Sequence, residues 1–382
     1  MTEPCSRSPG LPRVFGHDES VARIREAIHA GRLPQALLLH GAAGVGKRTV
    51  ALWIAASIAC EQEDAPCGAC RSCRLARRLE HPDIHIHFPM PRPKRASSPA
   101  KLRDAIETQR QERLAALRKG ARLPDEDTAT GIYLAAVEGI RAQASRRPAM
   151  GRRVVFVVVE ADRMVPQRAS PEAANALLKL LEEPPEFAHV ILTSSRRSAL
   201  LPTILSRTTS LRLAPIAEGE VARCLTEELG VAPEAARVAA RRSGGSVGSA
   251  VRLLETDDDA PGSAADRMLI AALRGDAALR YRVAGSFGAS GGRAVLAPAL
   301  ETLGERLRDL LCHVSGAEGL IRDPGAITRI PKIPAVSADG LLAALGAVDA
   351  ALDCAHKNLN PQSTVSVLLS DMSGAFVPED GR

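Results

Sequence analysis

Hydrophobic residues in the first half of the chain form short apolar runs separated by helical patterns. One apolar run covers Ala36 to Leu39, and after a Gly-rich turn the apolar residues from Val50 to Ile58 recur at helical spacing. Val154 to Val159 is a run of β-branched and aromatic residues bounded by charged ones, which is typical of a parallel strand covered on both faces. This alternation predicts an α/β sheet with right-handed crossovers.

The next segment continues the same pattern. A strand is predicted at Val190 to Thr193, and a helix before it at Pro171 to Glu183. Ser170 suits the N-cap of this helix, proline suits its first position, and the pair Pro184-Pro185 suits its end. The predicted sheet therefore has at least three strands with helices between them.

Strands disappear from the pattern after Pro215, where Ala-, Leu- and Arg-rich helical patterns begin. Breaks at Gly244-Gly245 and in the acidic stretch from Asp257 to Ser263 divide these helices. The predicted domains are an α/β domain at residues 1–214, a small helical domain at 215–258, and a helical packing or oligomerisation domain at 263–376.

Residues 89–126 interrupt the α/β pattern with a charged insertion. Four prolines open it, and a basic stretch from Lys101 to Arg122 then carries apolar residues at near-helical spacing. We predict an inserted charged helix, which is either a solvated insertion or an arm that contacts phosphates.

Composition narrows the classes of function. The chain has 382 residues and a formal net charge of +6, which tolerates an anionic partner without requiring one. Aromatic residues make up 2%, so a stacking platform for single-stranded nucleic acid is poorly supplied. No apolar run reaches the roughly 18 to 20 residues that a membrane span needs, and the N-terminus lacks the apolar core of a signal peptide. We therefore expect a cytoplasmic protein with no membrane partner.

A phosphate-binding loop is the first candidate site. The run from Gly41 to Thr49 reads GAAGVGKRT, follows a predicted strand and opens a predicted helix. Small residues at Gly41, Gly44 and Gly46 let backbone N–H groups converge on a phosphate, and Lys47 supplies a positive charge. The loop predicts a site for ATP or ADP and leaves open whether nucleotide binds.

The residues that would hold Mg²⁺ are replaced. Arg48 stands where a Ser or Thr hydroxyl would coordinate the ion, and Thr49 is an imperfect substitute because it is turned by roughly 100° along the helix. Glu160 and Asp162 match the later part of an Asp-Glu-Ala-Asp box, but Val159 takes the place of its metal-binding Asp. These substitutions argue against rapid ATP hydrolysis by this chain.

Four cysteines form a second candidate site. Their C-x6-C-x2-C-x2-C spacing places Cys60, Cys67, Cys70 and Cys73 within 14 residues directly after the phosphate-loop helix. Four thiolates so close predict one tetrahedral, structural Zn²⁺, and a closed shell of sulfurs leaves no open position for a substrate. Three nearby histidines are not needed as ligands and are expected on the surface of a strand or loop: His81, His85 and His87.

Together these motifs resemble the bacterial clamp-loader AAA+ subunits of DNA polymerase III. The resemblance covers residues 12–215 well and the remainder weakly. It implies an AAA+ P-loop domain with a parallel sheet and an inserted four-Cys zinc module, followed by a small helical lid and an all-α C-terminal collar. The motifs that carry it are GRLPQALLLHGAAGVGK, the four-cysteine insertion, HPD at 81–83, EADRM at 160–164 and NALLKLLEEPP at 175–185.

The resemblance also assigns roles to single residues. It implies an arginine finger at Arg207, which would act in trans on the γ-phosphate held by a neighbouring subunit, although a surface ion-pair residue is the alternative. Thr193 takes the place of the family's sensor-1 residue, and Thr also suits a strand end. Gly248 replaces the sensor-2 arginine of the motor subunits gamma and tau, which also carry an intact Asp-Glu box.

These departures resemble the delta-prime class of the family, which is kept for assembly more than for hydrolysis. The implied partners are gamma/tau motor subunits and a delta subunit in a hetero-pentamer, and through this complex the sliding clamp and primed DNA. Two alternatives remain open. In the first, the chain is an active AAA+ ATPase in which Thr49 and Glu160 take over the roles of the replaced residues. In the second, it is a zinc-dependent nucleic-acid-binding module.

Overall fold

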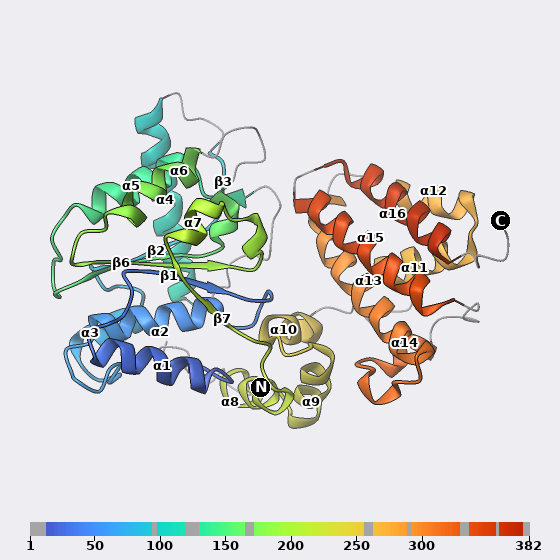
Figure 1. Ribbon diagram of the computed structural model, residues 1–382, viewed down its shortest axis with the longest axis horizontal. Coiled ribbons are helices and arrows are strands. Elements are labelled where there is room, and N and C mark those ends of the chain that lie inside the picture. Colours follow the sequence, from blue (N-terminus) through green and yellow to red (C-terminus); the bar gives the residue numbers. More distant parts are fainter. Residues whose placement is uncertain are drawn as a thin grey trace. The chain divides into compact units, whose positions relative to one another are not determined.

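Two compact units make up the chain (Figure 1). The described residues up to Val251 form the first unit, and those from Arg252 onward form the second. Within the described residues, no helix is both long enough and apolar enough to cross a membrane. The computed structural model describes residues 13–93, 98–119, 130–164, 172–255, 263–288, 292–328, 336–356 and 359–376.

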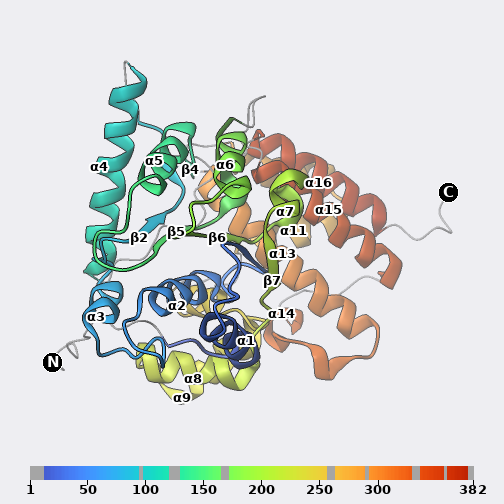
Figure 2. The ribbon, with the colours of Figure 1, turned by 60° about the vertical axis from the view of Figure 1, so that its left-hand side comes forward.

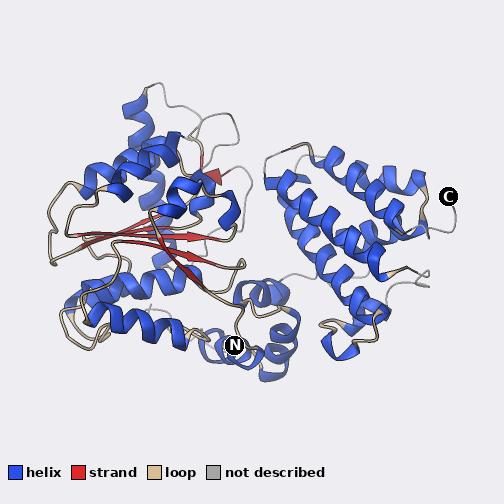
Figure 3. Cartoon of the chain, viewed as in Figure 1, coloured by secondary structure: helices blue, strands red, loops and turns tan. Residues whose placement is uncertain are grey.

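A five-stranded parallel sheet forms the centre of the first unit (Figure 3). Its strands stand in the order β2-β5-β6-β1-β7, and every neighbouring pair is parallel. Parallel neighbours require crossover connections, which the intervening helices supply. The α/β sheet predicted from the hydrophobic pattern is confirmed. The strands are β1 (Ala36–His40), β2 (Ile84–His87), β5 (Val154–Val158), β6 (Ala188–Ser194) and β7 (Thr209–Arg212).

The three predicted strands are present with slightly different ends. β1 continues to His40, β5 ends one residue earlier than predicted, and β6 begins two residues earlier, at Ala188. Strands β2 and β7 were not predicted, because their sequences IHIH and TSLR place polar residues between the apolar ones and lack an apolar run.

Helices cover both faces of this sheet because alternate strand residues point in opposite directions. Leu37 and Leu39 pack on one face with α1 and α2, whereas Leu38 and Phe156 pack on the other with α5 and α6. Figure 1 shows the two helical layers below and above the sheet. The helices are α1 (Asp18–His29), α2 (Lys47–Ala59), α3 (Arg71–Arg77), α5 (Leu134–Ala144), α6 (Glu172–Glu182) and α7 (Pro202–Ser206).

Helix α6 confirms the helix predicted before β6. It extends to Glu182, one residue short of the predicted end. Ser170 and Pro171, to which the N-cap and first-turn roles were assigned, lie outside the described residues.

The charged insertion folds partly into the core. Helix α4 (Pro99–Arg118) lies beside the edge strand β2 (Figure 2). Its residues Ile106 and Leu114 are buried in the same apolar cluster as the α1 and α2 residues that pack on the sheet. Arg110 is also buried, and it donates to the Ile86 carbonyl at 3.2 Å. A solvated insertion is therefore the wrong interpretation for the inner face of α4. The short strands β3 (Met90–Pro91) and β4 (Thr130–Gly131) pair antiparallel on either side of it.

Three short helices follow β7, and the first unit ends at Val251, inside the third of them. They enclose a small core of their own, to which Ile216, Val221 and Leu225 contribute. The domain boundary predicted at residue 215 stays a prediction, because these helices, up to Val251, belong to the same compact unit as the sheet. They are α8 (Glu218–Leu229), α9 (Pro233–Arg242) and α10 (Val247–Glu255).

The described residues of the second unit contain helices and no strand. Their core is apolar and is drawn mainly from α11, α13, α15 and α16, with Leu300, Leu341 and Leu369 fully buried. The helices are α11 (Ala264–Arg274), α12 (Ala277–Gly285), α13 (Gly292–Val314), α14 (Pro324–Thr328), α15 (Ala338–His356) and α16 (Pro361–Ala375).

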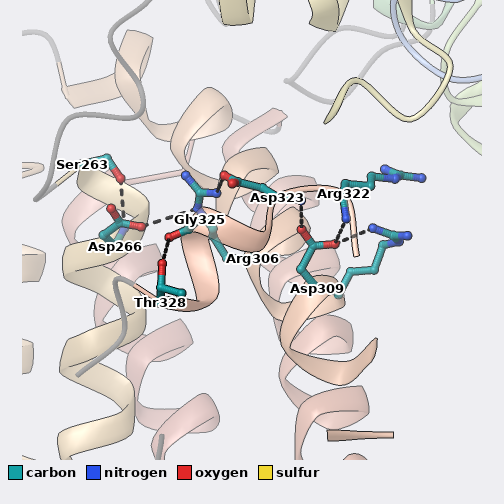
Figure 4. Close-up of polar contacts among 9 residues, drawn as sticks. Ser263, Asp266, Arg306, Asp309, Arg322, Asp323, Gly325 and Thr328 are labelled. Atoms are coloured by element: carbon teal, nitrogen blue, oxygen red, sulfur yellow. Dashed lines mark hydrogen bonds and ion pairs between the residues drawn. The ribbon is translucent and has the colours of Figure 1, made fainter. Parts of the chain in front are cut away.

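A buried polar network joins α13 to its neighbours in this unit (Figure 4). The guanidinium of Arg306 lies 3.5 Å from the Asp266 carboxylate on α11 and also pairs with Asp323, which precedes α14. One turn along α13, the buried Asp309 carboxylate accepts the backbone N–H groups of Arg322 and Asp323 at 3.1 and 2.8 Å. The network holds the segment between α13 and α14 against α13, because each buried charge is paired or hydrogen-bonded.

Candidate nucleotide and metal sites

The phosphate-loop residues connect β1 directly to α2, as the sequence pattern predicts. Gly44 and Gly46 have φ angles of 73° and 95°, in the left-handed region that glycine adopts without strain. Lys47 begins α2, and its Nζ donates to the carbonyls of Gly41 and Ala42 at 2.9 and 2.6 Å. The lysine ammonium is thereby folded over the loop, where it adds positive charge to the N-terminus of α2.

The residues around the loop differ in chemistry from a magnesium site. Arg48 is exposed, Thr49 is half-buried, and Val159 is 5% exposed at the end of β5. A valine side chain offers no oxygen to a cation, and a guanidinium repels one.

Glu160 has a structural partner at each of its polar groups. Its backbone N–H donates to Thr193 Oγ1 at 3.1 Å, and its carboxylate pairs with Arg163 Nε at 2.9 Å. Its φ angle of 53° is unusual for a residue with a side chain, so backbone strain is stored at the end of β5. Thr193 is buried on β6 and bridges the ends of two neighbouring strands.

A carboxylate and a histidine lie near the same edge of the sheet. Asp162 is buried and lies 3.4 Å from the Arg196 guanidinium. At the end of β1, burial lowers the pKa of His40, and the positive charges of Arg197 and Arg212 lower it further. The carboxyl ends of these strands therefore present a mainly positive environment.

Arg207 lies at the end of α7, before β7, with its side chain exposed. Its Nη2 pairs with Glu182 Oε1 on α6 at 2.8 Å, and Nη1 donates to the Thr203 carbonyl at 3.2 Å. These partners of Arg207 thus all come from α6 and α7. Glu182, which belongs to the NALLKLLEEPP motif, was not selected from the sequence, because a glutamate near a helix end is unremarkable by itself.

The phosphate loop also contacts the start of α10. Ser246 Oγ donates to the Ala43 carbonyl at 2.9 Å, and the Gly248 N–H donates to the Gly44 carbonyl at 3.1 Å. Gly248 therefore lies against the loop, where the resemblance places the sensor-2 residue. The role of Ser246 was not predicted from the sequence, although this serine lies only two residues before Gly248.

The four predicted cysteines come together in space. Their Sγ atoms all lie within 4.8 Å of one another, and the Cys60 and Cys70 sulfurs are 3.9 Å apart. A tetrahedral Zn²⁺ with bonds of about 2.3 Å needs sulfur atoms roughly 3.8 Å apart. The sulfurs of the cluster lie close to this spacing, so these four residues could hold a metal ion.

Backbone donors support thiolates in this cluster. The N–H groups of Cys70 and Cys73 each donate at 3.3 Å to the sulfur three residues earlier. Hydrogen bonds, first from the Cys70 N–H and then from the Ala69 N–H, lower the pKa of Cys67 to about 7, whereas burial raises the pKa of Cys73. A bound cation would overcome the effect of burial on Cys73, because a coordinating thiol loses its proton.

The three histidines near the cysteines are not surface residues as expected. His81 and His87 are buried, and His85 is half-buried with its ring stacked on Phe156 at 5.1 Å. The expectation of surface positions is wrong because β2 was not predicted as a strand of the sheet, and helix α4 covers this strand. Burial is the main cause of a lowered pKa at all three, so each favours the neutral form.

Asp83 of the HPD motif has a structural position that the sequence did not reveal. Its carboxylate accepts the N–H groups of Ala149, Met150 and Gly151 at 2.6, 2.9 and 2.8 Å. His81 in turn accepts the Asp83 N–H at 3.1 Å through Nδ1. The motif therefore ties the segment before β2 to the segment before β5.

Comparisons with known proteins agree with the resemblance. A family model described as DNA polymerase III, delta subunit, matches residues 16–217, more than half of the chain. DNA polymerase III subunit delta' of Bacillus subtilis is 27% identical over 236 residues, which are 62% of this chain and 58% of that protein. DNA polymerase III subunit gamma/tau of Mycobacterium bovis is 30% identical over 205 residues, 53% of this chain and 28% of that protein.

The chain thus spans less than two thirds of the length of either relative. Among solved structures, a DNA polymerase III, gamma subunit-related protein from Thermotoga maritima is similar with a TM-score of 0.40 and 16% identity. That match covers 94% of this chain and 99% of the other.

Proposed function

The chain belongs to the DNA polymerase III delta subunit family, and on that premise we propose that it is a delta-prime-type subunit of the clamp loader. It assembles with gamma/tau motor subunits and a delta subunit into a hetero-pentamer with an AAA+ arrangement of domains. The complex loads the sliding clamp onto primed DNA during replication. This subunit hydrolyses ATP poorly or not at all and contributes its geometry and one arginine to the assembly.

The combination of substitutions at the phosphate loop carries this proposal. Arg48, Val159 and Gly248 replace a hydroxyl, a carboxylate and a guanidinium that the motor subunits use, while Lys47 and the loop glycines remain. Binding of the nucleotide phosphates relies on the loop N–H groups and Lys47, whereas hydrolysis also requires a held Mg²⁺ and an oriented water. The remaining groups favour an ATP or ADP binding site without rapid turnover.

Arg207 contributes to catalysis at the neighbouring subunit's site in this proposal. Its guanidinium is exposed and is held by a surface pair with Glu182 and by hydrogen bonds to the Thr203 carbonyl and Ser206 Oγ. An exposed ion pair of this type contributes about 0–1 kcal/mol. Release from Glu182 is therefore inexpensive relative to the transition-state stabilisation that an arginine finger supplies, on the order of a thousandfold or more in rate. The exposed position is what a residue acting in trans requires.

The four-cysteine cluster stiffens the first unit in this proposal. A structural Zn²⁺ held by Cys60, Cys67, Cys70 and Cys73 would fasten the start of α3 to the end of α2. Its four sulfurs fill the coordination shell, so the metal takes no part in nucleotide chemistry.

The decisive experiment compares two variants in the reconstituted complex with the motor and delta subunits. Arg207→Ala should leave assembly intact and remove the DNA-stimulated ATPase of the one interface that Arg207 serves. Glu182→Gln removes the same ion pair but keeps the guanidinium, so its complex should hydrolyse ATP at the normal rate. Arg237→Ala, which breaks an exposed pair on α9, serves as the control.

The outcomes separate the open alternatives. If Arg207→Ala and Glu182→Gln behaved alike, Arg207 would be only a surface ion-pair residue. Robust Mg²⁺-dependent turnover by the isolated chain, abolished in Lys47→Ala, would indicate an active motor. DNA binding by the isolated chain with no capture of gamma/tau would indicate a zinc-dependent nucleic-acid-binding module.

A further inference from the structure

The phosphate loop and α10 approach each other more closely than residues with a Cβ atom would allow. A Cβ atom added to Gly44 would lie 2.3 Å from Ser246 Oγ, and one added to Gly248 would lie 2.8 Å from the Cα atom of Gly44. Contacts shorter than about 3.5 Å between carbon atoms are repulsive. Two glycines facing each other therefore permit a backbone approach that any larger residue prevents.

Hydrogen bonds fix this approach from the α10 side. Ser246 Oγ donates to the Ala43 carbonyl at 2.9 Å and also accepts the Ser249 N–H at 3.0 Å as a cap of the helix. The Gly248 N–H, which has no partner within the helix in the first turn, donates to the Gly44 carbonyl. The serine is 6% exposed, so its hydrogen bonds are shielded from water.

The opposite side of the loop is held by the N-terminal segment. Nε2 of the buried His17 lies 2.7 Å from the Val45 carbonyl. Three successive loop carbonyls, those of Ala43, Gly44 and Val45, thus have partners from outside the loop. These hydrogen bonds involve the carbonyl groups of the loop and not its N–H groups, which are the groups that a phosphate would use.

We propose that the phosphate loop serves as an internal docking site for α10, so that the Ser246–Gly248 segment holds the small helical part onto the α/β part without nucleotide. The glycine at position 248 then has two effects: it removes the sensor-2 arginine, and it allows the backbone of α10 to contact Gly44. An arginine side chain at this position begins with a Cβ atom that would strike Gly44, so the joint and the sensor-2 arginine exclude one another. The joint is a property of the isolated chain, independent of its role in a clamp loader.

Gly248→Ala in the full-length chain tests the joint, with Gly219→Ala as the matched control. Gly219 lies in α8 of the same small helical core, and an added Cβ there meets nothing within 4 Å. Alanine is favoured over glycine in helices, so helix propensity alone predicts that both variants are at least as stable as the parent chain. The joint predicts the opposite sign for Gly248→Ala.

Amide hydrogen exchange without nucleotide gives the readout. We expect Gly248→Ala to accelerate exchange by about tenfold or more in residues 41–47 and 246–251, with Gly219→Ala unchanged in both segments. Unchanged exchange in Gly248→Ala, or an increase spread evenly through the first unit, would overturn the proposal. If that variant does not fold, the parent chain decides: a Gly248 N–H that is unprotected until Mg²⁺ and ATP are added would equally overturn it.

Discussion

Asp83 provides the sharpest test of how the first unit is held together, because its carboxylate joins two segments that are far apart in sequence. The residue is 2% exposed and accepts three backbone N–H groups, from Ala149, Met150 and Gly151. In Asp83→Asn the shape is kept, but only one side-chain oxygen remains. The amide NH₂ must then face at least one N–H donor.

The expected loss follows from these contacts. Oδ2 receives two of the bonds and Oδ1 receives the third, so an asparagine oxygen at the Oδ2 position keeps two bonds as neutral ones. Hydrogen bonds to charged groups contribute roughly 1.5–3 kcal/mol and neutral ones roughly 0.5–1.5 kcal/mol. Exchanging three charged bonds for two neutral ones, with some relaxation, should lower the free energy of unfolding by about 4 kcal/mol.

Urea unfolding monitored by tryptophan fluorescence is the suitable assay. Trp53 is the chain's single tryptophan and is buried on α2, so its emission reports on the first unit alone. The midpoint should fall markedly in Asp83→Asn with the slope unchanged. Asp104→Asn, which changes an exposed aspartate on α4, should leave the midpoint in place.

The pH dependence gives a second test of the same reasoning. Burial raises the pKa of Asp83, but the N–H donors lower it more, so the net pKa lies below the ordinary value of 3.8. The stabilisation is fully present above that value and is lost as the pH falls through the folded-state pKa. The gap between the parent chain and Asp83→Asn should therefore be constant from pH 5 to 8 and narrow in stronger acid. A loss under about 1 kcal/mol at pH 7 would refute the anchoring role.

Two further predictions concern the cysteines and the buried histidines. Cys73→Ser should lower the zinc content measured by mass spectrometry from about one ion per chain to nearly none, whereas Cys224→Ser on α8 should leave it unchanged; equal zinc in both would exclude the cluster as the site. Burial, and then the charge of Arg110, lowers the pKa of His87 well below its ordinary 6.5, so the unfolded chain binds this proton more readily. Stability should therefore fall as the pH drops below about 6.5, less steeply in His87→Gln than in the exposed-site control His29→Gln; identical slopes would contradict this.

Local chemistry was readable from the sequence wherever neighbouring residues suffice to define it. The phosphate loop is a continuous run whose glycines and lysine act through the backbone that joins them, and the structure gives it the predicted place between β1 and α2. The four cysteines lie within 14 residues, so the short chain between them brings their sulfurs together. The strand at Val154 was readable because both of its faces are buried, which leaves a continuous apolar run.

Tertiary structure decided what depends on residues from distant segments. His87 is buried and His85 is half-buried because α4 packs over β2, and a sequence of alternating histidines carries no sign of that cover. The anchoring role of Asp83 depends on backbone N–H groups more than 60 residues away, which have no sequence signature at all. From the sequence, position 248 shows only that the expected arginine is missing. The fold alone shows that its glycine lies against Gly44, because packing and not either segment by itself sets the distance between two distant backbone segments.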